Sequence, residues 1–248
     1  MPRTTNGVGV QVEDTQICVV LVGLPARGKS YIAQKAQRYL RWLSIPAETF
    51  NVGNYRRKDA AQPTADFFDI NNPEGERKRR AAAEAAVADM LAWFRRGGIV
   101  GILDATNSTK ERRKWVMDTV SKEGIEVMFV ESKCDEESLI MGNIRDVKTT
   151  SPDYKGQDPE QAALDFRERI RNYEKVYKTI NEDGDEDQYT YLKIMDVGKQ
   201  VIINRIQDYL QSRVVYYLIN LHIRPRSVWL SRVSQTMMQR PGHLQYNY

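Results

Sequence analysis

A phosphate-binding motif, G-x-x-x-x-G-K-[S/T], is matched by Gly23-Leu24-Pro25-Ala26-Arg27-Gly28-Lys29-Ser30. Glycine allows the backbone to curl so that successive N–H groups point at phosphate oxygens. The Lys29 ammonium would reach the β- and γ-phosphates of a nucleotide, and the Ser30 hydroxyl would ligate Mg²⁺. The motif therefore predicts a site for ATP and Mg²⁺ rather than an ordinary glycine turn.

A carboxylate for the same metal is offered by Asp104, which follows the apolar run over 99–103. P-loop enzymes use an acid in such a position to hold Mg²⁺. An aspartate at the end of a strand also often caps the next helix, so both interpretations stay open. We favour a metal or reacting-group role for Asp104 because the P-loop is present.

These residues need a sheet to position them, and the hydrophobic pattern predicts one. Strands are predicted over 17–22, 47–52, 99–103, 125–130 and 189–197, and helices over 29–43, 74–96, 109–123, 135–148 and 159–179. The segment 200–221 is predicted to be a strand followed by a helix, or a helical ending. This alternation predicts an α/β fold with a mainly parallel sheet and helices on both faces. With the phosphate-binding motif, the expected fold resembles P-loop NTPases of the kind seen in nucleoside monophosphate kinases. The acidic run over 182–187 is predicted to be an exposed loop.

Length and composition set further limits. The 248 residues are 41% hydrophobic and 28% charged, which is typical of a globular chain. No run approaches the roughly 20 apolar residues of a membrane span, and residues 1–14 lack the apolar core of a signal peptide. We therefore expect a cytoplasmic protein without a membrane partner. Two cysteines and two histidines argue against a disulfide scaffold and a zinc site.

Charge and motif content narrow the chemistry. The formal net charge of +4 suits an anionic small molecule, and the basic residues form no stripe interleaved with aromatics, so nucleic acid is not an expected partner. The sequence lacks the Asn-Lys-x-Asp signature of guanine recognition, which leaves a kinase with a small acceptor. Arginine is favoured for phosphate because its planar fork binds two oxygens. Basic residues recur where loops meet strand ends, at Arg56, Arg57, Lys110, Arg112, Arg113 and Lys148.

Several further segments share their order and spacing with one known family. They are Phe50-Asn51-Val52-Gly53-Asn54-Tyr55-Arg56-Arg57, Asp104-Ala105-Thr106-Asn107, Asn143-Ile144-Arg145-Asp146-Val147-Lys148, Ser151-Pro152-Asp153-Tyr154 and Gln211-Ser212-Arg213-Val214-Val215-Tyr216-Tyr217-Leu218. With the P-loop, they resemble the kinase domain of the 6-phosphofructo-2-kinase/fructose-2,6-bisphosphatase family over about residues 15–232. The resemblance implies transfer of the γ-phosphoryl group of ATP to the 2-hydroxyl of fructose 6-phosphate. The product, fructose 2,6-bisphosphate, regulates glycolysis.

The resemblance also assigns residues to roles. ATP contacts fall on Gly23, Leu24, Pro25, Ala26, Arg27, Gly28, Lys29, Ser30, Tyr31, Asn143, Val147 and Lys148. Sugar-phosphate contacts fall on Arg56, Arg79, Thr106, Arg112, Lys148, Arg169 and Tyr173. The active-site Asp and Cys of the family correspond to Asp104 and Cys134. Lys29 and Lys148 would stabilise charge on the transferred group, and Ser30 and Asp104 are the expected Mg²⁺ ligands.

The resemblance weakens where a phosphatase domain would begin. The family opens that domain with Arg-His-Gly-Glu, whose histidine becomes phosphorylated, whereas this chain has Arg232-Val233-Ser234-Gln235. Valine cannot accept a phosphoryl group, so we expect no bisphosphatase activity. The chain is accordingly divided into a tail over 1–14, a kinase domain over 15–224, and a phosphatase remnant or disordered tail over 225–248.

Other interpretations stay open at this point. They are a catalytically inactive nucleotide-binding regulator, a fragment of a bifunctional enzyme, and a kinase for another small acceptor such as a nucleoside or gluconate. The intact residues Lys29, Ser30, Asp104 and Lys148 oppose an inactive site. The apolar residues within 216–221 form either a core helix or a self-association surface, so a homodimer is one expectation.

Overall fold

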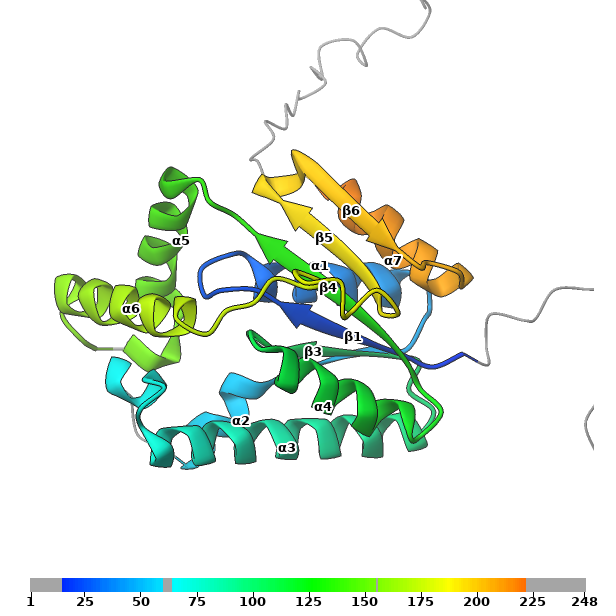
Figure 1. Ribbon diagram of the computed structural model, residues 1–248, viewed down its shortest axis with the longest axis horizontal. Helices are drawn as coiled ribbons and strands as arrows, with labels where there is room; N and C mark the ends of the chain where they lie inside the picture. Colours follow the sequence, from blue (N-terminus) through cyan, green and yellow to red (C-terminus); the bar gives the residue numbers. More distant parts are fainter. Residues whose placement is uncertain (1–14, 60–63, 155, 222–248) are drawn as a thin grey trace, which may run out of the picture.

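The computed structural model of the protein describes residues 15–59, 64–154 and 156–221. It contains a six-stranded sheet in the order β2-β3-β1-β4-β5-β6 (Figure 1). The strands are β1 Ile17–Val22, β2 Ala47–Asn51, β3 Val100–Asp104, β4 Glu126–Lys133, β5 Thr190–Met195 and β6 Gln200–Asn204. Neighbouring strands from β2 to β5 pair in parallel, and β6 pairs antiparallel with β5. The predicted mainly parallel α/β sheet is confirmed.

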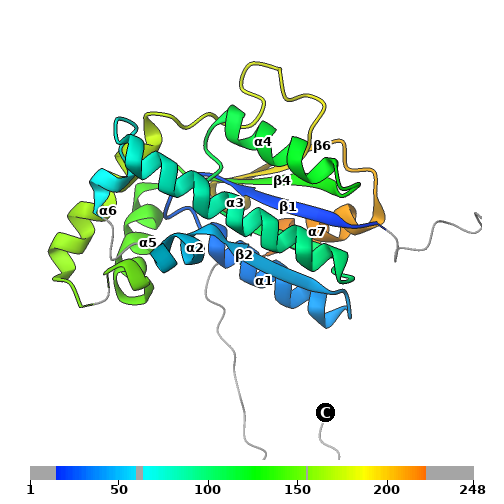
Figure 2. The same ribbon diagram turned by 90° about the horizontal axis from the view of Figure 1, so that it is seen from below.

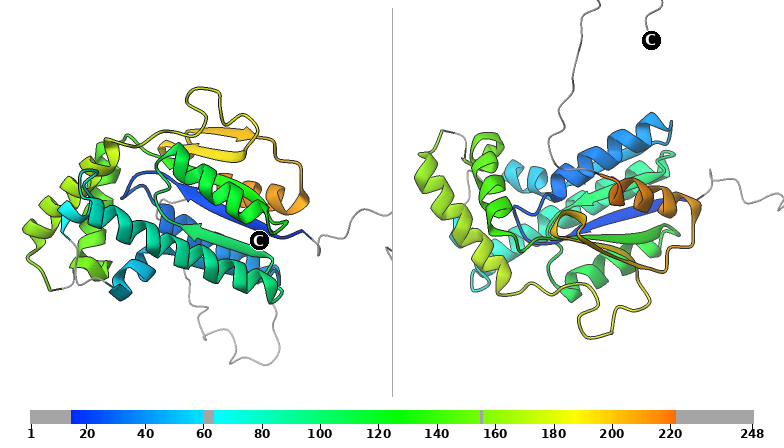
Figure 3. Two further views of the ribbon diagram at one scale, coloured as in Figure 1. Left: turned by 60° about the horizontal axis from the view of Figure 1, so that its bottom comes forward. Right: turned by 90° about the horizontal axis from the view of Figure 1, so that it is seen from above.

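Helices cover both faces of the sheet, as predicted. The left view of Figure 3 shows α3 (Pro73–Arg95) and α4 (Lys110–Ser121) before the sheet, and the right view shows α1 (Lys29–Trp42) and α7 (Tyr209–Ile219) on the other side. Alternate residues of β1 face the two layers because side chains alternate along a strand. Val19 and Leu21 share a buried cluster with Leu40 of α1. Val20 shares the opposite cluster with Met90 of α3.

A third group of helices lies beyond the carboxyl ends of the parallel strands (Figures 1 and 2). It contains α2 (Val52–Asp59), α5 (Glu137–Thr150), α6 (Pro159–Glu174) and two short 3₁₀ turns, η1 (Ala65–Phe68) and η2 (Pro152–Tyr154). A separate hydrophobic cluster joins Ile144 of α5, Tyr154 of η2 and Phe166 of α6. Ligands of open α/β sheets bind at this edge, so these helices form walls for the site.

Three elements of this group, α2, η1 and η2, were not predicted, and one helix is shorter than expected. The sequence of α2, which is VGNYRRKD, has no apolar stripe of the kind that identifies a helix. The helix predicted over 159–179 ends at Glu174, because the chain then turns toward the sheet. There the backbone N–H of Lys178 donates to the carbonyl oxygen of Ser108 at 2.8 Å.

The acidic run over 182–187 is not simply an exposed loop, so that prediction is wrong at Glu186. The Glu186 side chain is buried and accepts two hydrogen bonds of 2.7 Å from the guanidinium of Arg113. Arg113 is fully buried, and it serves this ion pair instead of an anion site. Lys110 likewise forms ion pairs with carboxylates of the acidic run, because its ammonium lies against Asp183 and Asp185.

Replacing Arg113 with alanine is expected to lower the free energy of unfolding by about 3–5 kcal/mol, because Glu186 would be left as a buried, unpaired charge. Urea unfolding measures the change. Lys114→Ala on the same helix is the matched control, since its pair with Asp118 is exposed and contributes roughly 0.3–0.5 kcal/mol. Equal losses in the two variants would contradict the structural role assigned to Arg113.

The predicted apolar face of the last helix is partly core and partly surface. Leu218 is buried, and the Tyr217 ring stacks on Tyr39 of α1 with centroids 4.1 Å apart. Tyr216 and Ile219 remain exposed. The segments predicted over 1–14 and 225–248, including Val233, lie outside the described residues. Within the described ranges, no helix is both long and apolar enough to cross a membrane.

Candidate active site

The phosphate-binding motif forms a tight loop between β1 and α1. Gly23 and Gly28 have φ angles of +137° and +77°, which are strained for residues with a side chain. A Cβ atom on Gly23 would lie 2.4 Å from the carbonyl oxygen of Ser132, so only glycine fits there. Helix α1 starts at Lys29, and its N-terminal N–H groups favour an anion at the loop.

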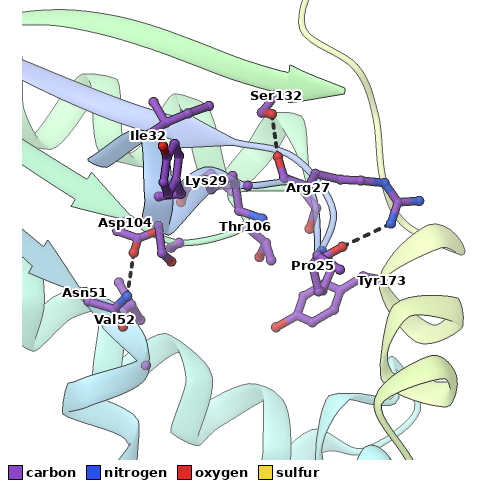
Figure 4. Close-up of a pocket in the computed structure, with 18 of the residues that line it drawn as sticks. Pro25, Arg27, Lys29, Ile32, Asn51, Val52, Asp104, Thr106, Ser132 and Tyr173 are labelled. Atoms are coloured by element: carbon purple, nitrogen blue, oxygen red, sulfur yellow. Dashed lines mark hydrogen bonds between the residues drawn. The ribbon is translucent and has the colours of Figure 1, made fainter. Parts of the chain in front are cut away.

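The loop is fixed from the neighbouring strand and helix. Arg27 Nε donates to the carbonyl oxygen of Cys134 at 2.8 Å. Ser132 Oγ donates to the carbonyl oxygen of Arg27 at 2.5 Å, as Figure 4 shows. From α5, Asn143 Nδ2 donates to the carbonyl oxygen of Ala26 at 2.8 Å. Arg27 therefore holds the loop to the end of β4.

Lys29 is a buried cation in the centre of the site. Its side chain is 8% exposed, and Nζ donates to the carbonyl oxygen of Leu24 at 2.6 Å. None of the ion pairs found among the described residues involves Lys29. Burial lowers its pKa to about 8, although the nearby carboxylate of Asp104 acts in the opposite direction. An arriving phosphate would supply the counter-charge that this ammonium needs.

The dissociation constant for ATP is expected to rise about tenfold between pH 7 and pH 9. With a pKa of about 8, Lys29 is mostly charged at pH 7 and mostly neutral at pH 9, and only the charged form attracts phosphate. Calorimetric titration across this range measures the change. Lys29→Arg keeps its charge throughout and should give a flat profile. A wild-type profile that is equally flat would refute the assignment.

Asp104 ends β3 beside the end of β2, where Asn51 is its register partner. The Asp104 side chain is 4% exposed, and Asn51 Nδ2 donates to Asp104 Oδ2 at 2.5 Å (Figure 4). Asn51 therefore positions the carboxylate. Sequence reasoning gave Asn51 no role, although its place at the end of the adjacent strand was a usable signal.

The oxygen donors for Mg²⁺ fit the way this ion is bound in P-loop sites. Within the described ranges, no group of three or more His, Cys, Asp or Glu residues could hold a metal ion. Mg²⁺ is usually held by one or two protein oxygens together with substrate phosphates and water. The Ser30 hydroxyl and the Asp104 carboxylate, which line the same cavity, offer such oxygens.

One cavity of about 1890 Å³ joins the P-loop to the third group of helices, and drug-sized ligands need only about 300–1,000 Å³. It has room for a nucleotide and a second substrate. Of the predicted site residues, its wall includes Pro25, Ala26, Arg27, Gly28, Lys29, Ser30, Tyr31, Arg56, Arg79, Asp104, Thr106, Arg112, Cys134, Asn143, Arg169 and Tyr173. Gly23 and Leu24 do not line it. Val147 and Lys148 lie near the end of α5, but their side chains are outside the described part of the structure.

Three arginines converge on one carboxylate at the far end of this cavity. Arg56 Nη2 donates to Asp153 Oδ2 at 2.5 Å, and Arg169 Nη1 donates to the same oxygen at 3.1 Å. Arg57 Nη1 donates to Asp153 Oδ1 at 3.2 Å. Within the described chain, Arg56 Nε and Nη1 and Arg169 Nε are buried and have no hydrogen-bond partner. Such donors predict an anionic ligand, since buried N–H groups are normally satisfied.

The remaining predicted acceptor residues lie along the same cavity. The Arg112 guanidinium stacks over Trp115 at 4.5 Å from the ring centroid, and burial lowers the pKa of Arg112 to about 10. The Arg79 guanidinium is held by the carbonyl oxygen of Phe67. Tyr173 lies on α6, with its ring 5.8 Å from that of Phe68. Their contacts with a substrate stay predictions.

Cys134 lies just after β4, at the edge of the P-loop. Its side chain is 7% exposed, and the contact it makes with the loop comes from its carbonyl oxygen, which accepts from Arg27. The geometry thus gives the Cys134 backbone a supporting role. A catalytic role for its thiol stays a prediction.

The parallel sheet, the loop after β1 and the acid at the end of β3 define a P-loop protein of the α/β class. The sequence profile of the 6-phosphofructo-2-kinase family matches residues 5–225. The chain therefore belongs to the 6-phosphofructo-2-kinase family.

Individual relatives agree with this placement. A protein of Saccharomyces cerevisiae named fructose-2,6-bisphosphatase is 44% identical over 227 residues, covering 90% of this chain and 50% of the relative. Human 6-phosphofructo-2-kinase/fructose-2,6-bisphosphatase 4 is 42% identical over 238 residues, covering 95% of this chain and 50% of the relative. The chain thus spans about half the length of these two curated relatives.

Solved structures show likeness in the fold alone. Chaetomium thermophilum Kti12, crystallised with ADP-AlF3, superposes with a TM-score of 0.50 at 17% sequence identity. The match covers 80% of this chain and 95% of Kti12. The common part is the P-loop α/β architecture.

Proposed function

We propose that this chain transfers the γ-phosphoryl group of ATP to the 2-hydroxyl of fructose 6-phosphate and so forms fructose 2,6-bisphosphate. Because the chain belongs to the 6-phosphofructo-2-kinase family, one observation of its structure carries the proposal. A single cavity connects a P-loop lysine that has no counter-ion among the described residues to buried arginine donors that have no partner. These two cationic ends suit a nucleotide triphosphate and a sugar phosphate.

At the nucleotide end, the P-loop N–H groups and Lys29 bind the phosphates of ATP. The cavity continues past Leu139 and Val197, which offer apolar contact to the base. Ser30 and Asp104 hold Mg²⁺, which supplies positive charge to the phosphate oxygens when bound. The family resemblance adds Asn143, Val147 and Lys148 to the nucleotide contacts.

At the acceptor end, Arg56 and Arg169 bind the 6-phosphate through their unpaired N–H groups, and Arg79, Thr106, Arg112 and Tyr173 border the sugar. The 2-hydroxyl oxygen forms a bond to the γ-phosphorus while the bond between that phosphorus and the β–γ bridging oxygen breaks, leaving ADP. Asp104 orients the hydroxyl and accepts its proton. Positioning and charge neutralisation are the main demands of phosphoryl transfer, so a strong base is not required.

The proposal includes the partners and setting of the reaction. We place the protein in the cytoplasm, where sugar phosphates are available, and assign it no bisphosphatase activity because Val233 replaces the phosphorylated histidine. A homodimer formed through the exposed Tyr216 and Ile219 is proposed as its assembly. Sedimentation at high concentration tests the assembly, and a monomer would contradict it.

The activity is tested by incubating the purified protein with MgATP and fructose 6-phosphate and assaying acid-labile fructose 2,6-bisphosphate. Wild type should form the product and Lys29→Met should not, while nucleosides and gluconate should not be phosphorylated. ATP binding without product would favour an inactive regulator or a fragment that needs the rest of a longer protein. The yeast relative is named only for the phosphatase reaction, so the test must distinguish an active kinase from an inactive one.

A further inference from the structure

We propose that Asp153 is a positioning residue for the acceptor: it holds Arg56 and Arg169 with their unpaired N–H edges free for the 6-phosphate, and it sets the charge of that site. The inference rests on the proposed function and extends it, because the family resemblance assigns no role to Asp153. The juxtaposition that carries it is one buried carboxylate shared by three arginines at the end of the cavity.

The four residues come from three separate elements. Arg56 and Arg57 lie on α2, Asp153 lies in η2, and Arg169 lies on α6. Asp153 is 3% exposed, and its oxygens accept from all three guanidinium groups. Asp153 therefore ties α2 to α6 across the cavity, so the distance between the two arginines depends on it.

The hydrogen bonds to Asp153 occupy one edge of the Arg56 and Arg169 guanidinium groups and leave other N–H groups unpaired. Arg56 donates from Nη2 to Asp153, while its Nε and Nη1 are buried without a partner among the described residues. Arg169 donates from Nη1 to Asp153, while its Nε is likewise buried without a partner among the described residues. Both guanidinium groups pack on the ring of Phe68, at 5.1 Å and 3.9 Å from its centroid, which restricts their planes.

Charge explains why a carboxylate is needed between the two arginines. Burial lowers the pKa of Arg56, and the adjacent charge of Arg169 lowers it further, so the cations repel each other. Burial alone would raise the pKa of Asp153, but Arg56, Arg169 and Arg57 outweigh it and lower this pKa, so Asp153 is ionised at neutral pH. Three positive charges and one negative charge leave +2, which matches the dianion of a phosphate monoester.

The expected kinetic effect is specific to one substrate. The 6-phosphate is remote from the reacting 2-hydroxyl, so its contacts are the same in the ground state and the transition state. Loss of such contacts raises KM and leaves kcat nearly unchanged. Hydrogen bonds to charged groups are strong enough that their misplacement should raise KM for fructose 6-phosphate about tenfold or more.

The test is Asp153→Asn, which keeps the shape of the side chain and removes its charge. KM for fructose 6-phosphate should rise about tenfold or more, while kcat and KM for ATP stay within about twofold of wild type. Asp165→Asn is the matched control. Asp165 belongs to the same group of helices and accepts from the Ala65 N–H at 2.7 Å and Tyr154 Oη at 2.8 Å. Its loss should lower the melting temperature without changing either KM.

Each outcome decides between the possibilities. An unchanged KM for fructose 6-phosphate in Asp153→Asn, or an equal rise in both KM values, would overturn the proposal and leave Asp153 a structural residue. If Asp153→Asn does not fold, Asp153→Glu keeps the charge but displaces the arginines, and it must show the same selective rise in KM. If wild type forms no product, the proposed function fails instead. Calorimetric binding of fructose 6-phosphate to wild type and Asp153→Asn then tests the positioning role by itself.

Discussion

Lys29→Met is expected to lower kcat about a thousandfold or more while the fold stays intact. The ammonium neutralises charge that develops on the phosphoryl group, and loss of one such preorganised group costs about a hundred- to a thousandfold in kcat, with larger losses for phosphoryl transfer. Methionine is similar in length and apolar, so it suits a side chain that is only 8% exposed. Initial rates at saturating substrates measure the effect.

A matched lysine separates this effect from a general loss of positive charge. Lys114 is exposed on α4 and pairs only with Asp118 among the described ion pairs, so Lys114→Met should retain wild-type kcat. Neither variant should melt at a lower temperature than wild type, so a lower rate would not come from unfolding. A kcat for Lys29→Met within tenfold of wild type would remove Lys29 from the mechanism.

Asp104→Asn has the second largest expected effect, a fall in kcat of about a hundred- to a thousandfold. An asparagine oxygen can still accept the hydrogen bond from Asn51, which is 2.5 Å in length for the carboxylate, so the geometry of the strand ends is retained. What disappears is the negative charge that attracts Mg²⁺ and the acceptor for the hydroxyl proton. Steady-state rates at increasing Mg²⁺ concentration measure both losses.

The dependence on Mg²⁺ distinguishes the two roles of Asp104. If Asp104 mainly binds the metal, a large excess of Mg²⁺ should restore much of the rate of Asp104→Asn. If it mainly orients the acceptor, the rate stays low at every Mg²⁺ concentration. A variant with wild-type kcat at ordinary Mg²⁺ would contradict both roles. Asp118→Asn, on the exposed face of α4, is the control for a lost carboxylate.

The nucleotide half of the site follows closely from local sequence. The strand predicted over 17–22 is β1 without a change of boundary, and the P-loop follows it because its glycines permit the required backbone. Asp104 was found because it directly follows an apolar run. These features depend on residues that are neighbours in the chain, which pattern and propensity describe well.

The acceptor half could be predicted only in part, because its contacts join distant segments. Arg56 is 97 residues from Asp153, and Arg113 is 73 residues from Glu186. The family resemblance pointed to Arg56 and Arg169, but no local pattern shows which basic residues meet a carboxylate and which face a cavity. Arg113 and Arg56 therefore looked alike in the sequence. Both form buried ion pairs, but only Arg56 keeps unpaired donors among the described residues.

The buried cations of this site also bear on how the chain balances stability against activity. The ligand-free protein keeps an ammonium and several guanidinium N–H groups away from water without full compensation, which opposes folding. A substrate that satisfies them adds its binding free energy to the folded state alone. Replacing Lys29, which has no ion pair among the described residues, with an apolar side chain would make the protein without substrate more resistant to unfolding and at the same time useless as a catalyst. Selection for thermal resistance without selection for turnover would accordingly favour early replacement of the buried ammonium in this cavity.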